Sequence, residues 1–372
     1  MLDLFVACAP GLEPLLAREL TDLGLAEVRS EPGGASVRAK PRAVAAICLG
    51  SGLANHLRLR VGAPFQVRHF DKLLKKTAAL PWGDLLRPGT RVKAHAVCRK
   101  SRLYHSGGVA QRVEAGIAKV IGAPADGTPE VDVAVRIVRD RCTLSLDLSG
   151  EALHRRGWRQ QTAKAPLRED LARALLIASG WDPSRPLFDP MMGSGTLVIE
   201  AATIARRIAP GLHRRFAFES TKLDAVADLE VQREAARARV LRAASVPLVG
   251  RDHMQGALDA AMGNAQRAGV EADVTLLRGK LDEPWPALDG AMVVSNPPYG
   301  IRVGHVASAH SLYATLGEQA KARGWPLGVV IADRRFVRAT GMPLQPKLTT
   351  DHGGIKISFY SSCSSSEASA RR

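Results

Sequence analysis

The sequence predicts an α/β protein in which a Rossmann-like sheet follows an α+β N-terminal part. In the C-terminal half, a short strand at 186–189 ends in Asp189 and runs into Pro190-Met191-Met192-Gly193-Ser194-Gly195-Thr196, and a helix starts at Leu197. This order of strand, glycine loop and helix opens a doubly wound sheet. Further on, the apolar run 291–294 stops at Ser295-Asn296-Pro297-Pro298-Tyr299-Gly300, because proline cannot donate a sheet hydrogen bond. Such sheets bind ligands at the carboxyl ends of their strands, which makes both stretches candidate sites.

The first 55 residues have the element order of a small ferredoxin-like unit. Residues 2–8 read as a strand, and 11–23 as a helix with its leucines on one face. Two short strands surround the Pro-Gly-Gly turn at 32–34, and 42–49 reads as a second helix. The order β-α-β-β-α is that of a compact α+β module.

The next part, 56–148, alternates strands with helices and is strongly basic. Strands are expected at 57–67 and 90–98, helices at 70–80 and 108–120, and a closing hairpin at 131–138 and 142–148. Residues 58–119 hold fourteen Lys and Arg but three acids, in a chain of net charge +16. Such clustering indicates a nucleic-acid partner more than a solvated face, and we assign phosphate contacts here to Lys72, Lys75, Lys76, Arg99, Lys100 and Arg102. His105 is expected to be a hydrogen-bonded surface histidine.

The composition is that of a globular protein and gives no sign of a membrane, secreted or disulfide-rich protein. An apolar fraction of 46% is ordinary for a globular protein, and no apolar run is long enough to span a membrane. The N-terminus lacks the basic region of a signal peptide. The five cysteines are odd in number and include no Cys-x-x-Cys pair, so we expect neither a disulfide framework nor a metal site. A cytoplasmic location follows.

The C-terminal half, 166–360, continues the α/β pattern after a linker at 149–165. A helix is expected at 171–180, a charged helix at about 222–243, and a strand at 247–252 that ends in Asp252. A carboxylate there can accept both ribose hydroxyls of a nucleotide cofactor. A helix at 257–268 and strands at 273–277, 326–332 and 354–360 complete the sheet. The Ser-rich tail from 361 to 372 is expected to be disordered.

The Asn-Pro-Pro-Tyr stretch suits chemistry on a nucleobase amine. The exocyclic nitrogen is a poor nucleophile because its lone pair is delocalised into the ring. Acceptors at the Asn296 side chain and the Pro297 carbonyl would help it to pyramidalise, and Tyr299 offers a stacking face, worth about 1–3 kcal/mol per base. An unstacked base would have to enter such a pocket. The alternative is that Asn-Pro-Pro only opens a loop.

The tetrad 296–299 resembles the motif of amino-group methyltransferases, which implies catalytic roles for Asn296, Pro297, Pro298 and Tyr299. The elements of 56–148, with Pro81-Trp82 and Lys-Ser-Arg-Leu-Tyr-His-Ser at 100–106, resemble a THUMP domain, which grips structured RNA. Residues 146–159, 165–169 and 201–219 are similar to bacterial large-subunit rRNA guanine-N2 methyltransferases. Some members carry a second methyltransferase domain, for which we expect no room here.

The resemblance implies a class I methyltransferase domain that uses S-adenosylmethionine, acts on 23S rRNA or alternatively tRNA, and works as a monomer. The implied cofactor residues are Pro166, Leu167, Asp189, Pro190, Gly193, Ser194, Gly195, Thr196, Asp252, Asp282 and Asn296. Arg155 and Arg156 in the linker are expected to contact RNA. Trp158 either packs an interface or lies against RNA.

One departure from the family pattern stands after the third strand. The acid expected to bind the adenine amino group is replaced by Lys280, and Asp282 is expected to take over that contact. Besides the tRNA enzyme, two alternatives stay open. One is a DNA adenine-amino methyltransferase, which shares the tetrad. The other is a non-catalytic RNA-binding factor, which Lys280 would favour.

Overall fold

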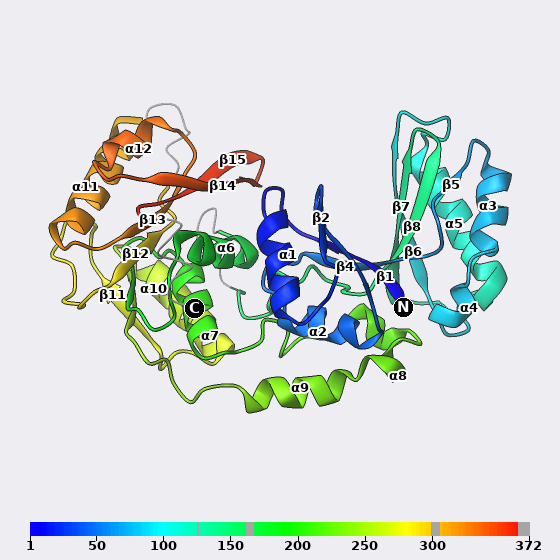
Figure 1. Cartoon of the computed structure of the whole chain (residues 1–372), viewed down its shortest axis with the longest axis horizontal. Coiled ribbons are helices and arrows are strands. Elements are labelled where there is room, and N and C mark those ends of the chain that lie inside the picture. The colour runs from blue at the N-terminus through cyan, green and yellow to red at the C-terminus, as the bar shows by residue number, and fades with distance from the viewer. Residues whose placement is uncertain (125, 161–166, 299–305, 364–372) are drawn as a thin grey trace. The chain divides into compact units, whose positions relative to one another are not determined.

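The computed structural model describes residues 1–124, 126–160, 167–298 and 306–363, with the side chains of 306–308 left aside (Figure 1). Two compact units divide the chain. Unit 1 comprises Met1–Cys8, Leu16–Leu153 and His213–Ala235, and unit 2 comprises Ala9–Leu15, His154–Leu212 and Ala236–Arg372. The chain therefore does not divide at one boundary. Part of the predicted C-terminal half lies in unit 1.

Unit 1 is built on one sheet of eight strands. Its order is β2-β3-β1-β4-β8-β7-β6, and β5 pairs with β8. The strands are β1 (Leu2–Ala7), β2 (Arg29–Glu31), β3 (Gly34–Ala39), β4 (His56–Arg60), β5 (Phe65–Gln66), β6 (Val92–Arg99), β7 (Val131–Val138) and β8 (Arg141–Asp147). Because β4 pairs with both β1 and β8, the segments 1–55 and 56–148 share this sheet.

Most helices of unit 1 are close to their predicted places. They are α1 (Glu13–Asp22, which begins in unit 2), α2 (Arg42–Gly50), α3 (Phe70–Ala78), α4 (Trp82–Leu85) and α5 (Ser106–Ile121), with α8 (Asp224–Ala227), α9 (Leu229–Ala238) and the 3-10 turn η1 (Ala217–Ser220) later in the chain. Helix α5 packs against α3 and β6. A Cβ atom on Gly116 would lie 2.8 Å from Thr77, so glycine permits this close helix contact.

Unit 2 contains a seven-stranded sheet in the order β11-β10-β9-β12-β13-β15-β14. The first five strands run parallel, and β15 is antiparallel to both of its neighbours, β13 and β14. The strands are β9 (Leu187–Asp189), β10 (Leu248–Asp252), β11 (Val274–Arg278), β12 (Met292–Ser295), β13 (Leu327–Ile331), β14 (Gln345–His352) and β15 (Ile355–Ser361). The predicted Rossmann-like sheet is thus confirmed. The strand order reverses between β9 and β12, which is where such sheets place their ligands.

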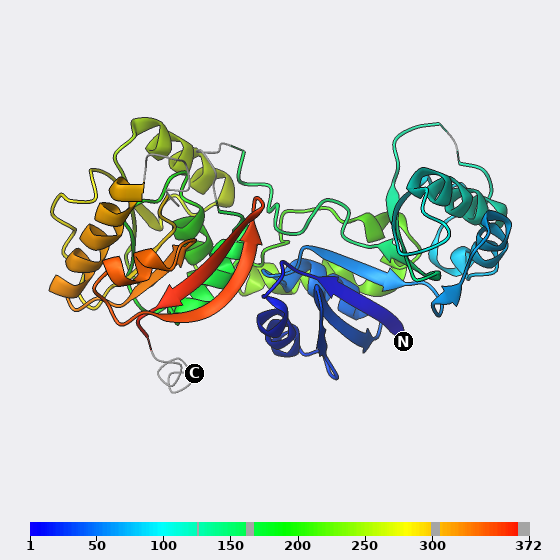
Figure 2. The ribbon, with the colours of Figure 1, turned by 90° about the horizontal axis from the view of Figure 1, so that it is seen from above.

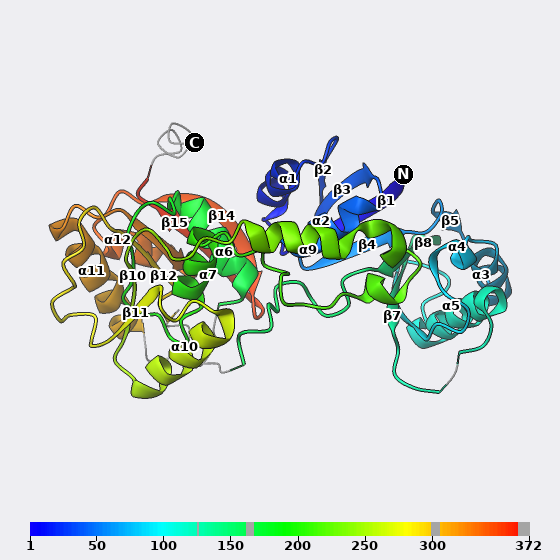
Figure 3. The same ribbon diagram turned by 90° about the horizontal axis from the view of Figure 1, so that it is seen from below.

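Helices cover both faces of this sheet (Figure 3). Helices α6 (Glu169–Ser179), α7 (Thr196–Ala205) and α10 (Gln255–Ala268) pack on the sheet strands, and α11 (Val306–Ala322) packs with α12 (Arg335–Ala339). Phe188, Val293 and Val329 form a buried cluster with Tyr313 and Leu316 of α11. The Tyr313 hydroxyl donates to the Val330 carbonyl at 3.0 Å, so its burial leaves no lost hydrogen bond.

Several elements differ from the sequence prediction. Helices α4 and α12 were not predicted, and the strand expected at 57–67 is divided into β4 and β5. The single helix expected at 222–243 is divided, because Asp228 takes a left-handed conformation (φ 54°) that ends α8. Strand β14, which pairs along β15 in the long hairpin seen in Figure 2, was not predicted, because Gln345-Pro346-Lys347 gives no apolar alternation. Over the described residues, no helix has the length and apolar character needed to cross a membrane.

Candidate active site

Three strands of unit 2 bring polar side chains to one edge of the sheet. β9 ends at Asp189, β10 at Asp252, and β12 at Ser295, directly before Asn296. β9 pairs in parallel with both neighbours, with Asp189 opposite Gly250 and Phe188 opposite Val293. The carboxyl ends of the three strands therefore lie side by side at the point where the strand order reverses.

The glycine loop turns tightly between β9 and α7. Gly193 and Gly195 have positive φ angles of 55° and 81°, which glycine adopts without steric cost. A Cβ atom on Gly195 would lie 2.9 Å from the Ala261 Cβ, so glycine also lets α7 approach α10. Thr196 could have served as the N-cap of this helix, as its hydroxyl suggests, but the structure does not use it in that way. Gly195 is the N-cap and Thr196 is the first, buried residue of the helix.

The two carboxylates of the edge differ in environment. Asp189 is buried, and its Oδ1 accepts hydrogen bonds from the Ser295 hydroxyl at 2.8 Å and the Met191 N–H at 3.1 Å. The pKa of Asp189 is raised to about 7, mainly by burial. The charge of Asp252 contributes to the rise, and the two hydrogen bonds oppose it. Asp252 is half-buried and accepts the N–H groups of Gly193 at 3.1 Å and Met254 at 3.0 Å.

The raised pKa predicts a specific pH dependence of stability. Because Asp189 holds its proton more tightly in the folded protein, its contribution to the free energy of unfolding is full below about pH 4 and falls as the pH rises to about 7. The loss is on the order of 4 kcal/mol. Asp189→Asn cannot ionise, so its urea midpoint should fall less than that of the wild type between about pH 5 and pH 8. Equal pH dependence in both proteins would contradict the raised pKa.

The residues at this edge fit a nucleoside cofactor with an ammonium group. Within the described part of the chain, the buried Ser194 hydroxyl has no hydrogen-bond partner, and such a group calls for a ligand or a water. Two carboxylates suit an ammonium group and ribose hydroxyls, and the positive-φ glycines let a ligand approach the backbone. Leu167 and Pro190 are both buried. Pro166 lies outside the described residues.

The Asn-Pro-Pro segment extends directly from β12. Asn296 is half-buried, Pro297 is buried and Pro298 is exposed. Tyr299 lies outside the described residues, so its stacking role stays a prediction. Asn296 and the Pro297 carbonyl therefore stand at the strand end next to Asp189, which suits two acceptors for an amine that would enter from the edge.

The loop after β11 is held by a residue that the sequence did not single out. The Arg251 guanidinium donates to the carbonyls of Lys280 at 3.4 Å, Glu283 at 3.3 Å and Pro284 at 2.8 Å. Lys280 and Asp282 are both exposed on this loop. The adenine contact expected of Asp282 stays a prediction. A basic residue inside a strand gave no signal, because its partners are backbone atoms.

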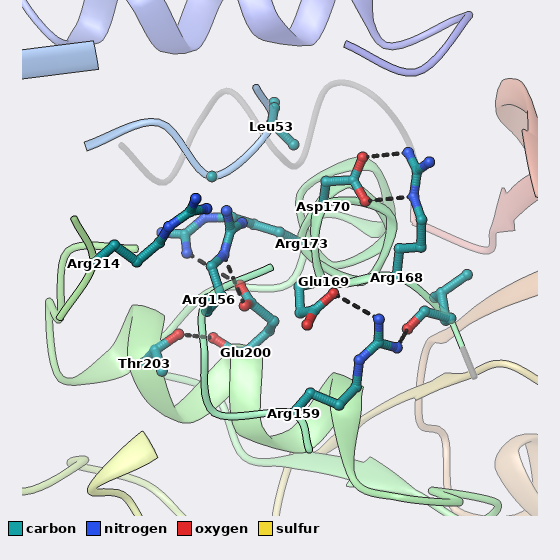
Figure 4. A network of polar contacts seen from close by, with 12 residues as sticks. Leu53, Arg156, Arg159, Arg168, Glu169, Asp170, Arg173, Glu200, Thr203 and Arg214 are labelled. Carbon is teal, nitrogen blue, oxygen red and sulfur yellow. Dashed lines mark hydrogen bonds and ion pairs between the residues drawn. The ribbon is translucent and has the colours of Figure 1, made fainter. Parts of the chain in front are cut away.

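The linker arginines correct one prediction. The Arg156 side chain is only 3% exposed and lies 3.5 Å from Glu200, which also pairs with Arg173 at 3.2 Å (Figure 4). A buried, paired guanidinium cannot reach a phosphate, so Arg156 is a structural residue. Nearby, Arg159 pairs with Glu169 at 2.9 Å. Arg155 is exposed, which is compatible with its expected role, and Trp158 is buried, so its ring is not presented to RNA.

In unit 1, the basic residues gather on two places. Lys72, Lys75 and Lys76 are exposed on α3. The second place, called here the basic loop surface, consists of the exposed residues Arg68, Arg99, Lys100, Arg102, Arg139 and Arg141. The exposed ring of Tyr104 follows it in the chain. His105 caps α5 by accepting the Gly108 N–H at 3.0 Å, which confirms its structural role.

Asp140 holds the basic loop surface together. Its carboxylate accepts the Arg102 N–H at 2.7 Å and the Arg68 Nε–H at 3.0 Å, and its own N–H donates to the Ser101 hydroxyl at 3.0 Å. The Arg102 N–H and then Arg68 lower the pKa of Asp140. Lys100, Arg139 and Asp140 all have positive φ angles, a conformation that costs energy in non-glycine residues and gathers at functional sites.

Comparison with known proteins agrees with this architecture. Residues 156–352 match the family described as RMKL-like, methyltransferase domain, and residues 3–57 match the RlmL ferredoxin-like domain. The chain is 36% identical to the ribosomal RNA large subunit methyltransferase K/L of Syntrophotalea carbinolica over 91% of its length, and 36% identical to that of Chromohalobacter salexigens over 95%. It spans about half the length of these relatives, 50% and 51%.

Solved structures are similar over nearly the whole chain. SMU.472 complexed with SAH superimposes with a TM-score of 0.89 at 26% identity, over 97% of both chains. A possible methylase from Clostridium difficile 630 gives 0.87 at 29% identity, also over 97% of both chains. A predicted N6-adenine-specific DNA methylase from Listeria monocytogenes gives 0.85 at 28%, over 96% of both. With the family match covering more than half of its residues, the chain belongs to the RMKL-like methyltransferase-domain family.

Proposed function

We propose that this protein transfers a methyl group from S-adenosylmethionine to the exocyclic N2 amine of a guanosine in 23S rRNA. The observation that carries the proposal is the position of Asn296 and Pro297 at the end of β12, next to Asp189 and the glycine loop of β9. The relatives named ribosomal RNA large subunit methyltransferase K/L support this substrate class. We also propose that the reaction takes place in the cytoplasm and that the enzyme is a monomer.

The mechanism needs positioning more than acid–base chemistry. The bound cofactor would supply an electrophilic methyl group on a sulfonium. The Asp252 carboxylate would accept the ribose hydroxyls of the cofactor, and the glycine loop would hold its amino acid end through backbone groups. The Asn296 side-chain oxygen and the Pro297 carbonyl would accept the two amine hydrogens and direct the nitrogen lone pair towards the methyl carbon. The transfer would replace the C–S bond of the cofactor by an N–C bond, and the amine would then lose one proton to solvent.

RNA would be held by unit 1. We propose that residues 56–148 form a THUMP domain. It would lie between a ferredoxin-like domain at 1–55 and the methyltransferase domain at 166–360. Its exposed lysines on α3 and the basic loop surface would contact phosphates, which position the substrate without reading its sequence. Tyr104, whose ring is 82% exposed, offers a stacking face for an unpaired base.

A DNA adenine-amino methyltransferase is the second candidate, because one similar structure carries that description. Both candidates use the same acceptors for an exocyclic amine. The motif itself does not distinguish guanine from adenine. The resemblance of the basic part of unit 1 to a THUMP domain favours RNA over DNA.

One experiment separates these functions. Purified protein is incubated with labelled S-adenosylmethionine and protein-free large-subunit rRNA, bulk tRNA or duplex DNA, each from a strain lacking the gene, and the products are analysed as nucleosides. We expect N2-methylguanosine in rRNA alone. The same nucleoside in tRNA would change the substrate, N6-methyladenine in DNA would support the second candidate, and no label with no cofactor binding would indicate a non-catalytic RNA-binding factor.

The RNA surface has its own test in the salt dependence of binding. Replacing Lys100 and Arg102 with alanine should weaken RNA binding and reduce the slope of log K against log salt by up to about 2, because each lost phosphate contact releases about one counterion fewer. The matched control removes two exposed lysines of unit 2, Lys321 and Lys356, and should leave the slope unchanged. Equal slopes for wild type and the Lys100/Arg102 variant would exclude the basic loop surface.

A further inference from the structure

Ser295 joins the two halves of the candidate active site. It is the last residue of β12, directly before Asn296, and its hydroxyl donates to Oδ1 of Asp189 at 2.8 Å. Ser295 is 0% and Asp189 1% exposed, so water does not compete for this hydrogen bond. The bond links the strand that presents the amide to the strand that starts the glycine loop.

The Asp189 side of this link is fixed by the loop itself. The same Oδ1 accepts the Met191 N–H at 3.1 Å, and Asp252 accepts the Gly193 N–H at 3.1 Å. The Asn264 amide donates to the Ser194 carbonyl at 3.1 Å. The glycine loop is therefore held from β9, β10 and α10, and it gives Asp189 a defined position towards Ser295.

The Asn296 side is followed by two residues that lack a backbone donor. Ser295 still pairs with Val329 of β13, but Pro297 and Pro298 have no N–H to donate. The Ser295 hydroxyl therefore makes a side-chain hydrogen bond at the end of β12, directly before the Asn296 side chain. A shift of about 1 Å in a positioned group can cost about a hundredfold in rate, so the place of this hydrogen bond matters for Asn296.

We propose that Ser295 is a positioning residue, which fixes the Asn296 amide relative to the glycine loop through its hydrogen bond to Asp189. This inference rests on the proposed function, since it assigns Ser295 a part in the methyl transfer. Ser295 itself touches neither the amine nor the methyl group. Its removal should therefore affect turnover more than substrate binding.

The first readout is the division of the effect between kcat and KM. Ser295→Ala should lower kcat by about tenfold or more with KM for S-adenosylmethionine within about threefold, whereas Ser295→Thr keeps the hydroxyl and should restore most of kcat. The matched control is Ser361→Ala. Ser361 is also buried at a strand end of this sheet, and its hydroxyl donates to the Ser179 carbonyl at 2.9 Å. A loss of kcat in Ser361→Ala as large as in Ser295→Ala would overturn the proposal.

The second readout needs no bound cofactor. In ligand-free protein, carbon NMR of the carboxyl groups follows the titration of Asp189, identified by its absence in Asp189→Asn. Among the described residues, Asp252 is the charged group that acts on Asp189, the His253 ring lies 3.4 Å from Asp252, and Arg251 lies over the ring of the neighbouring Phe188. Because the Ser295 hydrogen bond lowers the pKa of Asp189, Ser295→Ala should move the titration to higher pH and Ser361→Ala should not.

The outcomes separate this inference from the proposed function. If wild-type protein methylates neither RNA nor DNA, the function fails, while the NMR shift still shows whether Ser295 and Asp189 are coupled. If the wild type is active and Ser295→Ala keeps kcat within about twofold, the positioning role is wrong. An unmoved Asp189 titration in Ser295→Ala would equally overturn it.

Discussion

Replacing Asn296 with alanine should reduce kcat for methyl transfer by about 10²–10³-fold, the usual cost of removing one group aimed at a transition state. The side chain is half-buried at the end of β12, beside the strand that carries Asp189. Its oxygen would accept an amine hydrogen while the nitrogen pyramidalises. The affinity for S-adenosylhomocysteine, measured by calorimetry, should stay within about threefold, because the proposed cofactor site is formed mainly by the glycine loop.

A second substitution at the same position tests the reason. Asn296→Asp keeps an acceptor oxygen of similar size, so it should retain more turnover than the alanine variant. Equal losses in both would mean that acceptance of the amine hydrogen is not the role of Asn296. A near wild-type rate in Asn296→Ala would remove the residue from the mechanism.

Replacing Glu200 with alanine should lower the free energy of unfolding by about 3–5 kcal/mol, since removing one partner of a buried ion pair leaves uncompensated charge. Glu200 is 1% exposed on α7 and pairs with both Arg156 and Arg173, which are 3% and 14% exposed. Its backbone carbonyl also accepts the Thr203 hydroxyl at 2.9 Å (Figure 4). Two guanidinium groups would therefore lose their carboxylate.

Urea unfolding at neutral pH measures this loss. Glu318→Ala is the matched control, because it makes the same change at an exposed position of helix α11 and should alter stability by no more than about 0.5 kcal/mol. If both variants unfold at the same urea concentration, the Glu200 network does not stabilise unit 2.

The candidate site was predictable from sequence where local chemistry constrains the backbone. Pro297 and Pro298 end β12, and Gly193 and Gly195 take positive φ angles, because no neighbouring sequence can change what proline and glycine permit. Asp189 and Asp252 could also be found from the sequence, because each is the last residue of a short strand. Parallel pairing then brings these strand ends together without further information.

Other features depend on partners far away in the chain. Arg156 looked like a surface residue because its partner Glu200 is 44 positions later, and only folding brings them together. Arg251 holds the loop after β11 through backbone carbonyls, which leave no trace in the sequence. Strand β14 has a mostly polar, exposed sequence and exists because β15 offers it a partner along the sheet edge.

The division of the chain also bears on its synthesis. Unit 1 includes His213–Ala235 and unit 2 includes Ala9–Leu15, so the chain passes between the units five times. A ribosome adds about 5–20 residues per second and releases the N-terminal part first. Unit 1 still lacks His213–Ala235 when β9 and the glycine loop of unit 2 have already emerged. Ala9–Leu15 of unit 2 are synthesised before any strand of its sheet. Unit 1 can therefore be completed once Ala235 has emerged, whereas unit 2 must wait for the segment from Ala236 onwards, and no single cut of the gene would yield both units whole.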